Sequence, residues 1–422
     1  MIIYTKNNCK SLSDVNRCCK EIGYGLSWLE RLLYTQDVPG SNPGVPKYRK
    51  WRIILKKLFF LSLVVISIFS IACQRRNVNQ RPAFDGVTVR LLTDATGVDD
   101  KSFNAAAWRG ILEFYGDTWA NPRQRGIAYD WVTAQTQDMY IPNLRQATDE
   151  GYDLIIATGF TWDDAVDTVA ADNPHQKYLI VDVDWLQSPN VMQAVYAEHE
   201  GSYLVGVAAA LKAIEDGIVN PRFGFIGGVP GAVITKFQVG YVQGILSVLP
   251  NAQIVDYYVN SWGEPALAKT QAKNWYDAGV YAIYSAAGGS GNGTIAQAKE
   301  YRDSGRNVWA IGVDSDQHEE GIFNNAGDSA VLTSMLKRVE SSVIYALNSV
   351  KNNTFTGRVI TFDLKADGVG YSTSNPAMSS AIVEQLEIVR EKIISGEIRV
   401  ASTLAEAMRL PGFPQNLRAI DD

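Results

Sequence analysis

One short segment of the chain combines the side chains that could hold a small organic molecule. Asp94 follows an apolar, strand-like run at residues 87–93, and Phe103 and Asn104 open a pattern with helical spacing. In open α/β sheets, ligands bind beyond the carboxyl ends of the strands, where Asp94 is expected. A carboxylate and an amide can bond hydroxyl groups, while an aromatic face can stack on a flat ring. The segment predicts a small-molecule site, although an ordinary strand-to-helix turn with Ser102 as the helix cap also fits these residues.

A glycine loop at residues 288–293 has the composition of a phosphate-binding loop but not the spacing. Thr294 stands where the dinucleotide pattern G-x-G-x-x-G needs its last glycine, and no Gly-Lys-Ser or Gly-Lys-Thr follows. We therefore interpret the loop as a place where the backbone approaches a ligand closely. Gly288 is expected to contribute to the site there through its main chain.

Residue types that enzymes commonly use are present in the sequence, but they do not form the catalytic motifs that were sought. The sequence has no nucleophile elbow and no zinc-protease motif, and its three histidines, His175, His199 and His318, are scattered among polar residues. We expect a protein that is not an enzyme and that uses no cofactor and no metal. A calcium-assisted nucleoside hydrolase stays open as an alternative, since aspartates at strand ends can bind calcium.

Strand and helix patterns alternate along most of the chain, which is typical of βαβ units and a mostly parallel sheet. Strands are predicted at residues 87–93, 127–132, 153–157 and 178–183, and an alanine-rich helix follows at 200–214. Asn220-Pro221 interrupts the pattern before a second series. That series has strands at 222–226, 253–259, 281–285 and 308–312, and helices at 235–249, 265–278 and 294–304. Right-handed crossovers make each series a three-layer sandwich, so we predict an α/β fold with two α/β/α lobes.

The pattern changes after Asp314. A strand and then a helix are predicted between residues 330 and 350, short strands at 358–363 and 368–371, and an amphipathic helix at 378–395.

The N-terminal region contains an export signal. Basic residues cluster between Lys47 and Lys57, and an apolar run of about 15 residues follows from Leu58 to Ala72. This length is short of the roughly 20 residues that a transmembrane helix needs. We assign residues 51–72 to a signal peptide. Because a signal begins just before its basic segment, we expect residues 1–50 to be an extension outside the exported protein, either untranslated or disordered.

Cys73 stands where lipidation would need a thiol. The run Ser70-Ile71-Ala72-Cys73 resembles the lipobox of bacterial lipoproteins, with Ser70 in the place usually taken by leucine. The other cysteines, Cys9, Cys18 and Cys19, all precede it, so the exported part cannot form an internal disulfide. Residues 73–86 are polar and predict a tether between a lipid anchor and the folded part.

The exported part is acidic. Residues 1–72 hold 11 of the 39 basic and 4 of the 45 acidic residues, which leaves 28 basic and 41 acidic residues and a net charge of −13. This balance argues against nucleic-acid binding, which needs a basic face. It also favours an uncharged ligand over a phosphorylated one, because no basic cluster is available for phosphate.

Several segments match one known family in the same order. The segment D-x-x-G-x-D-D-x-S-F-N at residues 94–104 is similar to the first signature of the basic membrane lipoprotein family, the substrate-binding lipoproteins of ABC importers. Further matching segments lie at 153–160, 178–182, 200–206, 224–228, 288–293, 311–317 and 333–338. The resemblance spans roughly residues 87–400. The family includes the purine nucleoside receptors of bacteria.

The resemblance implies a type I periplasmic binding fold whose lobes are joined by a hinge. We expect an N-terminal lobe of residues 87–219 plus 329–356 and a C-terminal lobe of residues 220–328 plus 357–422. The resemblance also implies a monomer that is exported, anchored to the cell membrane by lipid at Cys73, and served by an ABC permease.

The resemblance further implies a set of ligand contacts. The purine would lie between Phe103 and Trp262, where the family more often has phenylalanine at the second position. Asp182 would bond the base edge, with Asp184 as the alternative. The ribose set would be Asp94, Asn104 and Asp314, and Lys337 would reach the ribose or its carboxylate partners.

Purine nucleoside uptake is thus the function that the sequence predicts. A binding protein of the same fold for a sugar or another small polar ligand is the first alternative, because such sites use the same residue types. The nucleoside hydrolase is the second alternative.

Overall fold

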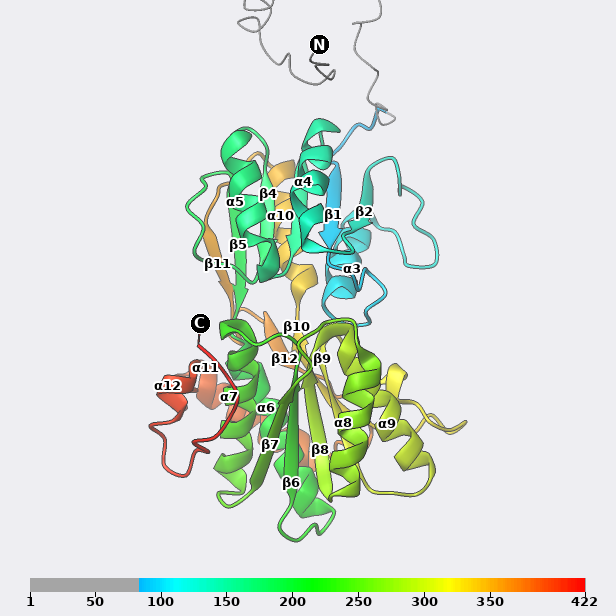
Figure 1. Ribbon diagram of the computed structural model, residues 1–422, viewed down its shortest axis with the longest axis vertical. Helices are drawn as coiled ribbons and strands as arrows, with labels where there is room; N and C mark the ends of the chain where they lie inside the picture. The colour runs from blue at the N-terminus through cyan, green and yellow to red at the C-terminus, as the bar shows by residue number, and fades with distance from the viewer. Residues whose placement is uncertain (1–82, 422) are drawn as a thin grey trace, which may run out of the picture. The chain divides into compact units, whose positions relative to one another are not determined.

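Two six-stranded sheets organise the residues that the computed structural model describes, 83–421 (Figure 1). Each sheet lies between helices, so the predicted fold of two α/β/α lobes is confirmed. The predicted signal peptide, Cys73 and most of the tether lie outside the described residues. Within the described part of the chain, no helix combines the length and apolarity needed to cross a membrane.

The first sheet has the strand order β11-β5-β4-β3-β1-β2, and all of its pairings are parallel. Its strands are β1 (Val89–Thr93), β2 (Tyr129–Thr133), β3 (Leu154–Thr158), β4 (Tyr178–Val181), β5 (Val191–Tyr196) and β11 (Val359–Phe362). Helices α3 (Phe103–Tyr115) and α10 (Val339–Lys351) pack in the core on one face, and α4 (Tyr140–Asp149) and α5 (Asp163–Asp172) on the other. Successive residues such as Leu91 and Leu92 belong to the two different cores, because side chains alternate across a strand.

The second sheet has the strand order β12-β10-β9-β8-β6-β7, with β12 antiparallel to its neighbour. Its strands are β6 (Arg222–Gly227), β7 (Gln253–Tyr258), β8 (Val280–Ala286), β9 (Trp309–Asp314), β10 (Val331–Lys337) and β12 (Val369–Tyr371). Helices α6 (Glu198–Glu215) and α7 (Ala232–Val248) cover one face, and α8 (Pro265–Asp277) and α9 (Asn292–Asp303) the other. Short 3-10 turns η1 (Gln137–Met139), η2 (Phe160–Trp162), η3 (Gly288–Gly291) and η4 (Glu319–Gly321) follow strands at the edges of the lobes.

Helices α6 and α7 pack at unusually close range. A Cβ atom on Gly206 would lie 2.3 Å from the carbonyl oxygen of Tyr241, and one on Gly244 would lie 2.1 Å from that of Tyr203. The two backbones therefore touch where the glycines face them, which no larger residue would allow. Helix α6 is buried on nearly all sides, as its alanine-rich sequence predicts.

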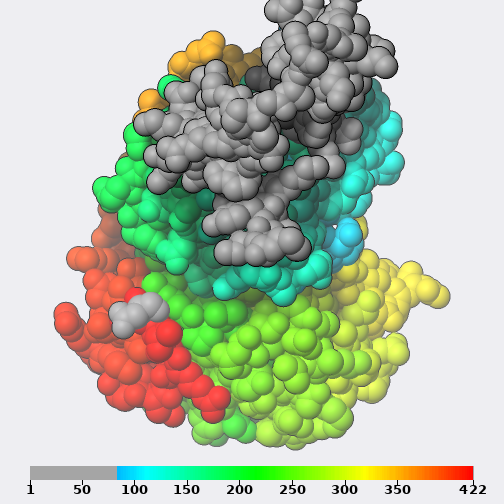
Figure 2. All heavy atoms as spheres, turned by 45° about the horizontal axis from the view of Figure 1, so that its top comes forward, coloured from blue at the N-terminus to red at the C-terminus, as the bar shows by residue number. Residues whose placement is uncertain are grey.

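The C-terminal region extends the second lobe. Helix α11 (Ser380–Ile394) packs against α6, and α12 (Leu404–Ala407) packs against α7. Figure 2 shows the red atoms of this C-terminal segment beside green atoms of the second lobe. A small apolar core that includes Phe413 and Leu417 seals it to α7.

The chain crosses between the lobes three times, from β5 to α6, from β10 to α10 and from β11 to β12. The lobe boundaries expected from sequence differ from this arrangement at three elements. Helix α6 and strand β10 belong to the second lobe, and β11 belongs to the first. Strand β10 pairs with β9, the strand that precedes it in the chain, whereas β11 pairs with β5, a partner distant in sequence that leaves no local signal.

Candidate functional site

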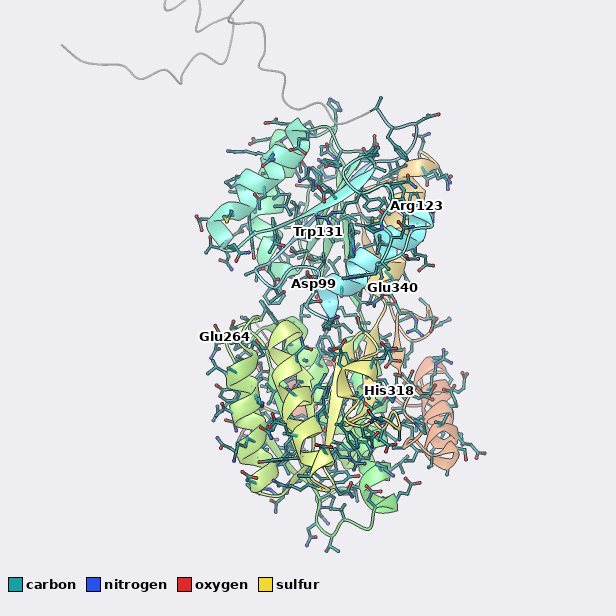
Figure 3. All side chains as sticks on the ribbon, turned by 90° about the vertical axis from the view of Figure 1, so that its right-hand side faces the viewer. Asp99, Arg123, Trp131, Glu264, His318 and Glu340 are labelled. Carbon is teal, nitrogen blue, oxygen red and sulfur yellow. The ribbon has the colours of Figure 1, made fainter. Side chains whose placement is uncertain are left out.

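A cavity lies between the facing ends of the two lobes. It is lined by residues at the carboxyl ends of β1, β3, β4, β8, β9 and β10, by the loop after β7 and by the first turns of α3 and α7. Figure 3 shows Asp99 and Glu264 at these facing ends, one on each lobe. The empty space among these residues is about 600 Å³, open solvent at its mouth included.

All eight residues that the sequence nominated line this one cavity. They are Asp94, Phe103, Asn104, Asp182, Trp262, Gly288, Asp314 and Lys337. They come from both sheets, so the strand-end rule used for Asp94 extends to Asp182 and Asp314. Their contact with a ligand stays a prediction.

The first wall is a network of short polar side chains around Asp94. The Asp94 carboxylate accepts hydrogen bonds from the Thr96 backbone N–H at 3.0 Å and from the Asn104 amide at 3.0 Å. The Asn104 carbonyl oxygen in turn accepts from the Thr158 hydroxyl at 2.6 Å. Asp94 is only partly buried, whereas Asn104 and Thr158 are almost fully buried. The network fixes these groups in one orientation, which suits the recognition of hydroxyl groups.

The N-terminus of α3 is capped by Asp100 rather than by the expected Ser102. Asp100 accepts the backbone N–H groups of Ser102, Asn104 and Ala105 at 2.8 to 2.9 Å. Ser102 makes no side-chain cap bond. Its hydroxyl instead donates across the lobes to Asp314 at 2.6 Å. A serine before a helical pattern looks the same in sequence whether it caps the helix or donates to a residue of the other lobe. The sequence therefore could not distinguish these two roles.

Four aromatic residues line the cavity, Phe103 and Phe160 from the first lobe and Trp262 and Phe237 from the second. Phe103 opens α3 in the first lobe, and Trp262 lies in the loop after β7 in the second. Trp262 lies against glycine backbone, because a Cβ on Gly228 would fall 2.1 Å from its ring and one on Gly288 3.6 Å from it. The Gly288–Gly291 turn also holds the Trp262 loop, since the Ser290 N–H donates to the Trp262 carbonyl at 2.7 Å. Of the glycines at 288–293, only Gly288 lines the cavity.

Phe160 is a cavity residue that the sequence reasoning did not nominate. It follows β3 in the first lobe and meets Trp262 edge to face, with ring centroids 6.2 Å apart. The segment at 153–160 resembles the corresponding segment of the family. A phenylalanine directly after a buried strand, however, is usually a core residue. Its position at a strand end was the signal that could have identified it.

Lys337 is buried between two carboxylates. It is the last residue of β10 and only 1% exposed, and its ammonium lies 2.6 Å from Asp182 and 2.9 Å from Glu198. Burial alone would lower the pKa of Lys337, but Asp182, Glu198 and Asp314 raise it overall. Burial raises the pKa of Asp182, an effect that Lys337 partly offsets. Lys337 therefore carries a charge at the cavity wall, paired with its carboxylate partners.

Asp314 ends β9 with its backbone in the left-handed region, at φ +62°, and Asp182 after β4 has φ +70°. Such a conformation is uncommon outside glycine and often marks a functional position. It turns both carboxylates toward the same cavity. Burial raises the pKa of Asp314 to about 7, although Lys337 and Ser102 act in the opposite direction.

Asp184, the alternative to Asp182, does not line the cavity. It is exposed to solvent, because β4 ends at Val181 and the turn at Asp182 breaks the alternation that would have aligned the two side chains. Among residues 83–421, no group of three or more histidine, cysteine, aspartate and glutamate side chains is arranged to hold a metal ion.

Comparison with known proteins places this architecture in context. A family model described as ABC transporter substrate-binding protein PnrA-like matches residues 87–403. The CD4+ T-cell-stimulating antigen of Listeria innocua is 34% identical over 361 residues, 84% of this chain and 99% of that protein. The ABC transporter nucleoside-binding protein BmpA of Lactococcus lactis is 35% identical over 319 residues, 74% of this chain and 87% of that protein. A crystal structure of a solute-binding protein of an ABC transporter system from Aeropyrum pernix matches with a TM-score of 0.66 at 25% identity, covering 76% of this chain and 95% of that one.

Proposed function

The chain belongs to the family of PnrA-like ABC transporter substrate-binding proteins, and from this premise we propose that it binds purine nucleosides between its lobes for uptake. A substrate-binding protein of this kind captures a small molecule and delivers it to a permease. The choice of ligand is the part that the family does not decide.

One observation carries the nucleoside assignment. Phe103 and Trp262 line one cavity from different lobes, and polar groups that suit hydroxyls lie beside them. Two aromatic faces can hold a planar base by offset stacking. Asp94, Asn104 and Asp314 can bond the vicinal hydroxyls of a ribose, because carboxylates accept from hydroxyls and the amide can also donate. A ligand with one flat apolar part and one hydroxylated part uses every wall of this cavity.

The charge of the cavity supports a neutral ligand. Its one lysine, Lys337, is already paired with Asp182 and Glu198, so no free cation is left among the lining residues to hold a phosphate. The name of the Lactococcus lactis relative, a nucleoside-binding protein, agrees with this assignment.

Binding would act by closing the lobes. Polar contacts already bridge them, among them Ser102 with Asp314, Arg109 with Ser315 at 2.9 Å and Asn292 with the Asp100 carbonyl at 3.0 Å. A ligand that touches both lobes binds the closed arrangement more tightly than an open one and therefore shifts the population toward it. The permease would then recognise the closed arrangement.

The anchoring of the protein is part of the proposal. The export signal at residues 51–72 and the position of Cys73 support an exported protein held at the cell membrane by a lipid on that cysteine. Mass spectrometry of the native protein would test this, since a lipid-modified Cys73 at the new N-terminus is expected. A mature chain that begins elsewhere or carries an unmodified Cys73 would rule the anchor out.

Two alternatives remain open for the ligand. A sugar could use the carboxylates and stack on a single aromatic ring, but it would leave the second ring without a flat partner. A nucleoside hydrolase would use the same contacts and then cleave the bond between base and ribose. The same experiment separates both from the main proposal.

Calorimetric titration of the purified protein with guanosine, inosine, adenosine, a pyrimidine nucleoside, ribose and galactose is the direct test. Tight binding of purine nucleosides that are recovered intact is expected. Binding of sugars alone would overturn the stacking assignment. Release of free base, detected by chromatography of the same mixtures, would make the protein a hydrolase.

A further inference from the structure

Glu198 is a buried carboxylate that stands behind the cavity wall. It is the first residue of α6, is 1% exposed and does not line the cavity. Its Oε1 lies 2.9 Å from the Lys337 ammonium, which itself lies 2.6 Å from Asp182. The Lys337 ammonium therefore lies between Glu198 and Asp182, the carboxylate proposed to face the ligand.

The surrounding charges form an alternating chain. Asp182, Lys337, Glu198 and Lys236 follow one another, with 3.6 Å between Lys236 and the Oε2 of Glu198. This Oε2 makes no hydrogen bond within the described part of the chain. The first three members are almost fully buried, whereas the Lys236 side chain is 27% exposed. A charge change on one buried member is therefore felt strongly by the next.

We propose that Glu198 is a positioning residue that keeps Asp182 a strong hydrogen-bond acceptor and thereby selects purines with an N–H donor on the ring edge. This inference rests on the proposed nucleoside function. Glu198 shares the charge of Lys337, so the negative charge of Asp182 is only partly compensated. A carboxylate can accept but not donate, so it favours a 6-oxo purine, whose ring nitrogen N1 carries a hydrogen, over a 6-amino purine, whose N1 is an acceptor.

The substitution Glu198→Gln tests this inference because it keeps the side-chain size and removes the charge. Lys337 would then pair with Asp182 alone, and the Asp182 carboxylate would be a weaker hydrogen-bond acceptor for the ligand. A charge-assisted hydrogen bond would become closer to an ordinary one, which lowers the ratio of inosine to adenosine affinity by about tenfold. A purely structural role of Glu198 would weaken both ligands alike and leave the ratio unchanged.

Glu200→Gln is the matched control. Glu200 lies on the same first turn of α6 but accepts the backbone N–H of Leu364 at 3.0 Å instead of pairing with Lys337. Its substitution is expected to leave the affinity ratio as it is. The full chain is used throughout, and a thermal melt establishes that each variant is folded.

Lys236→Met provides a second, independent measurement should Glu198→Gln not fold. Loss of this partly exposed cation leaves Glu198 a stronger partner for Lys337, so the inosine preference is expected to rise by a few fold. A folded Glu198→Gln with an unchanged ratio would overturn the inference, and so would an unchanged ratio in Lys236→Met. Failure of the unmodified protein to bind any nucleoside would instead overturn the proposed function.

Discussion

At the scale of single residues, the two aromatic rings carry the most direct prediction. Replacing Phe103 or Trp262 with alanine is expected to cost ~1–3 kcal/mol of purine nucleoside binding for each ring, because stacking on a base is worth about that much. Calorimetric titration with guanosine or inosine measures the loss. Trp119→Ala is the control, since Trp119 is an exposed aromatic of the first lobe that does not line the cavity. Unchanged affinity in both cavity variants would remove stacking from the model.

Asp314 leads to a prediction about stability and pH. Burial raises its pKa from 3.8 to about 7, so the folded protein holds this proton more tightly than the unfolded chain. As far as this group is concerned, the free energy of unfolding is highest below pH 4. It falls by up to about 4 kcal/mol as the pH rises toward 7, at ~1.4 kcal/mol for each pH unit. Asp314→Asn can still accept from Ser102 but cannot ionise, so the free energy of unfolding should fall less between pH 4.5 and pH 8 than in the unmodified protein.

Urea unfolding at these two pH values measures the difference. Asp316→Asn is the control, because Asp316 is exposed on the same loop. If Asp314→Asn loses as much stability as the unmodified protein across this range, Asp314 is already ionised at low pH and burial does not raise its pKa.

The site residues show what local sequence can and cannot reveal. Asp94 could be predicted because strand ends in α/β proteins follow a geometric rule and this carboxylate follows an apolar run, whereas Asp182 and Asp314 were expected from the resemblance to the family. Glu198 could not, because a glutamate at the start of a helix usually serves the helix dipole in solvent. Its burial depends on β10 bringing Lys337 from 139 positions later in the chain.

At the scale of elements, the cap of α3 positions two of the cavity residues, Phe103 and Asn104. Asp100→Ala removes the acceptor for three backbone N–H groups and is expected to lower the free energy of unfolding by about 1–2 kcal/mol. Phe103 and Asn104 lie in this first turn, so nucleoside affinity should also fall. Asp100→Asn keeps an acceptor oxygen and should retain most of the stability.

Asp99→Ala is the matched control for this helix start. Asp99 is adjacent in sequence but exposed, and Figure 3 shows it at the end of the first lobe. Chemical denaturation and calorimetry compare the three variants. A loss in Asp99→Ala equal to that in Asp100→Ala would mean that general charge near the helix end, and not the cap, stabilises α3.

The same scale explains where the predicted elements differ from the observed ones. Long strands and helices with clear periodicity, such as β8 and α6, were predicted within a few residues of their bounds. Strand β5 was not predicted, because Val191–Tyr196 is a short run with a polar residue, Gln193, at its centre. Its neighbours β4 and β11 complete its pairing, and β11 is distant in sequence. Tertiary pairing of this kind overrides local propensity.

At the scale of the whole described unit, three features converge on the hinge. Glu198 directly follows the first crossing of the chain, Lys337 directly precedes the second, and Glu200 accepts from Leu364 in the third. The ion pair between Glu198 and Lys337 therefore joins the first and second crossings of the chain. Lys337 also lines the cavity. Asp182 and Lys337, the proposed ligand contacts, are thus close to the segments that would bend if the lobes move.

Lobe closure can be observed directly because the cysteines of this chain are conveniently placed. All four lie within residues 1–73 and can be replaced by serine, after which Asp172→Cys on α5 and Lys273→Cys on α8 place one dye on each lobe. Both positions are exposed, so labelling should not disturb the fold. Energy transfer between the dyes is expected to change when inosine is added, and the ligand concentration at the midpoint should match the calorimetric affinity.

Ser102→Ala in this labelled protein tests whether contact between the lobes stabilises the closed arrangement. The substitution removes the hydrogen bond from Ser102 to Asp314 and leaves the cap by Asp100 in place. At pH 8, where Asp314 with its pKa of about 7 is mostly ionised, a net hydrogen bond to this charged group is worth about 1.5–3 kcal/mol, so the closed population should fall and the midpoint for inosine should move up by about tenfold or more. Since Ser102 does not line the cavity, direct contact with the ligand cannot explain such a shift. An unchanged midpoint would mean that the ligand alone holds the lobes together and that the contact between Ser102 and Asp314 follows closure without stabilising it.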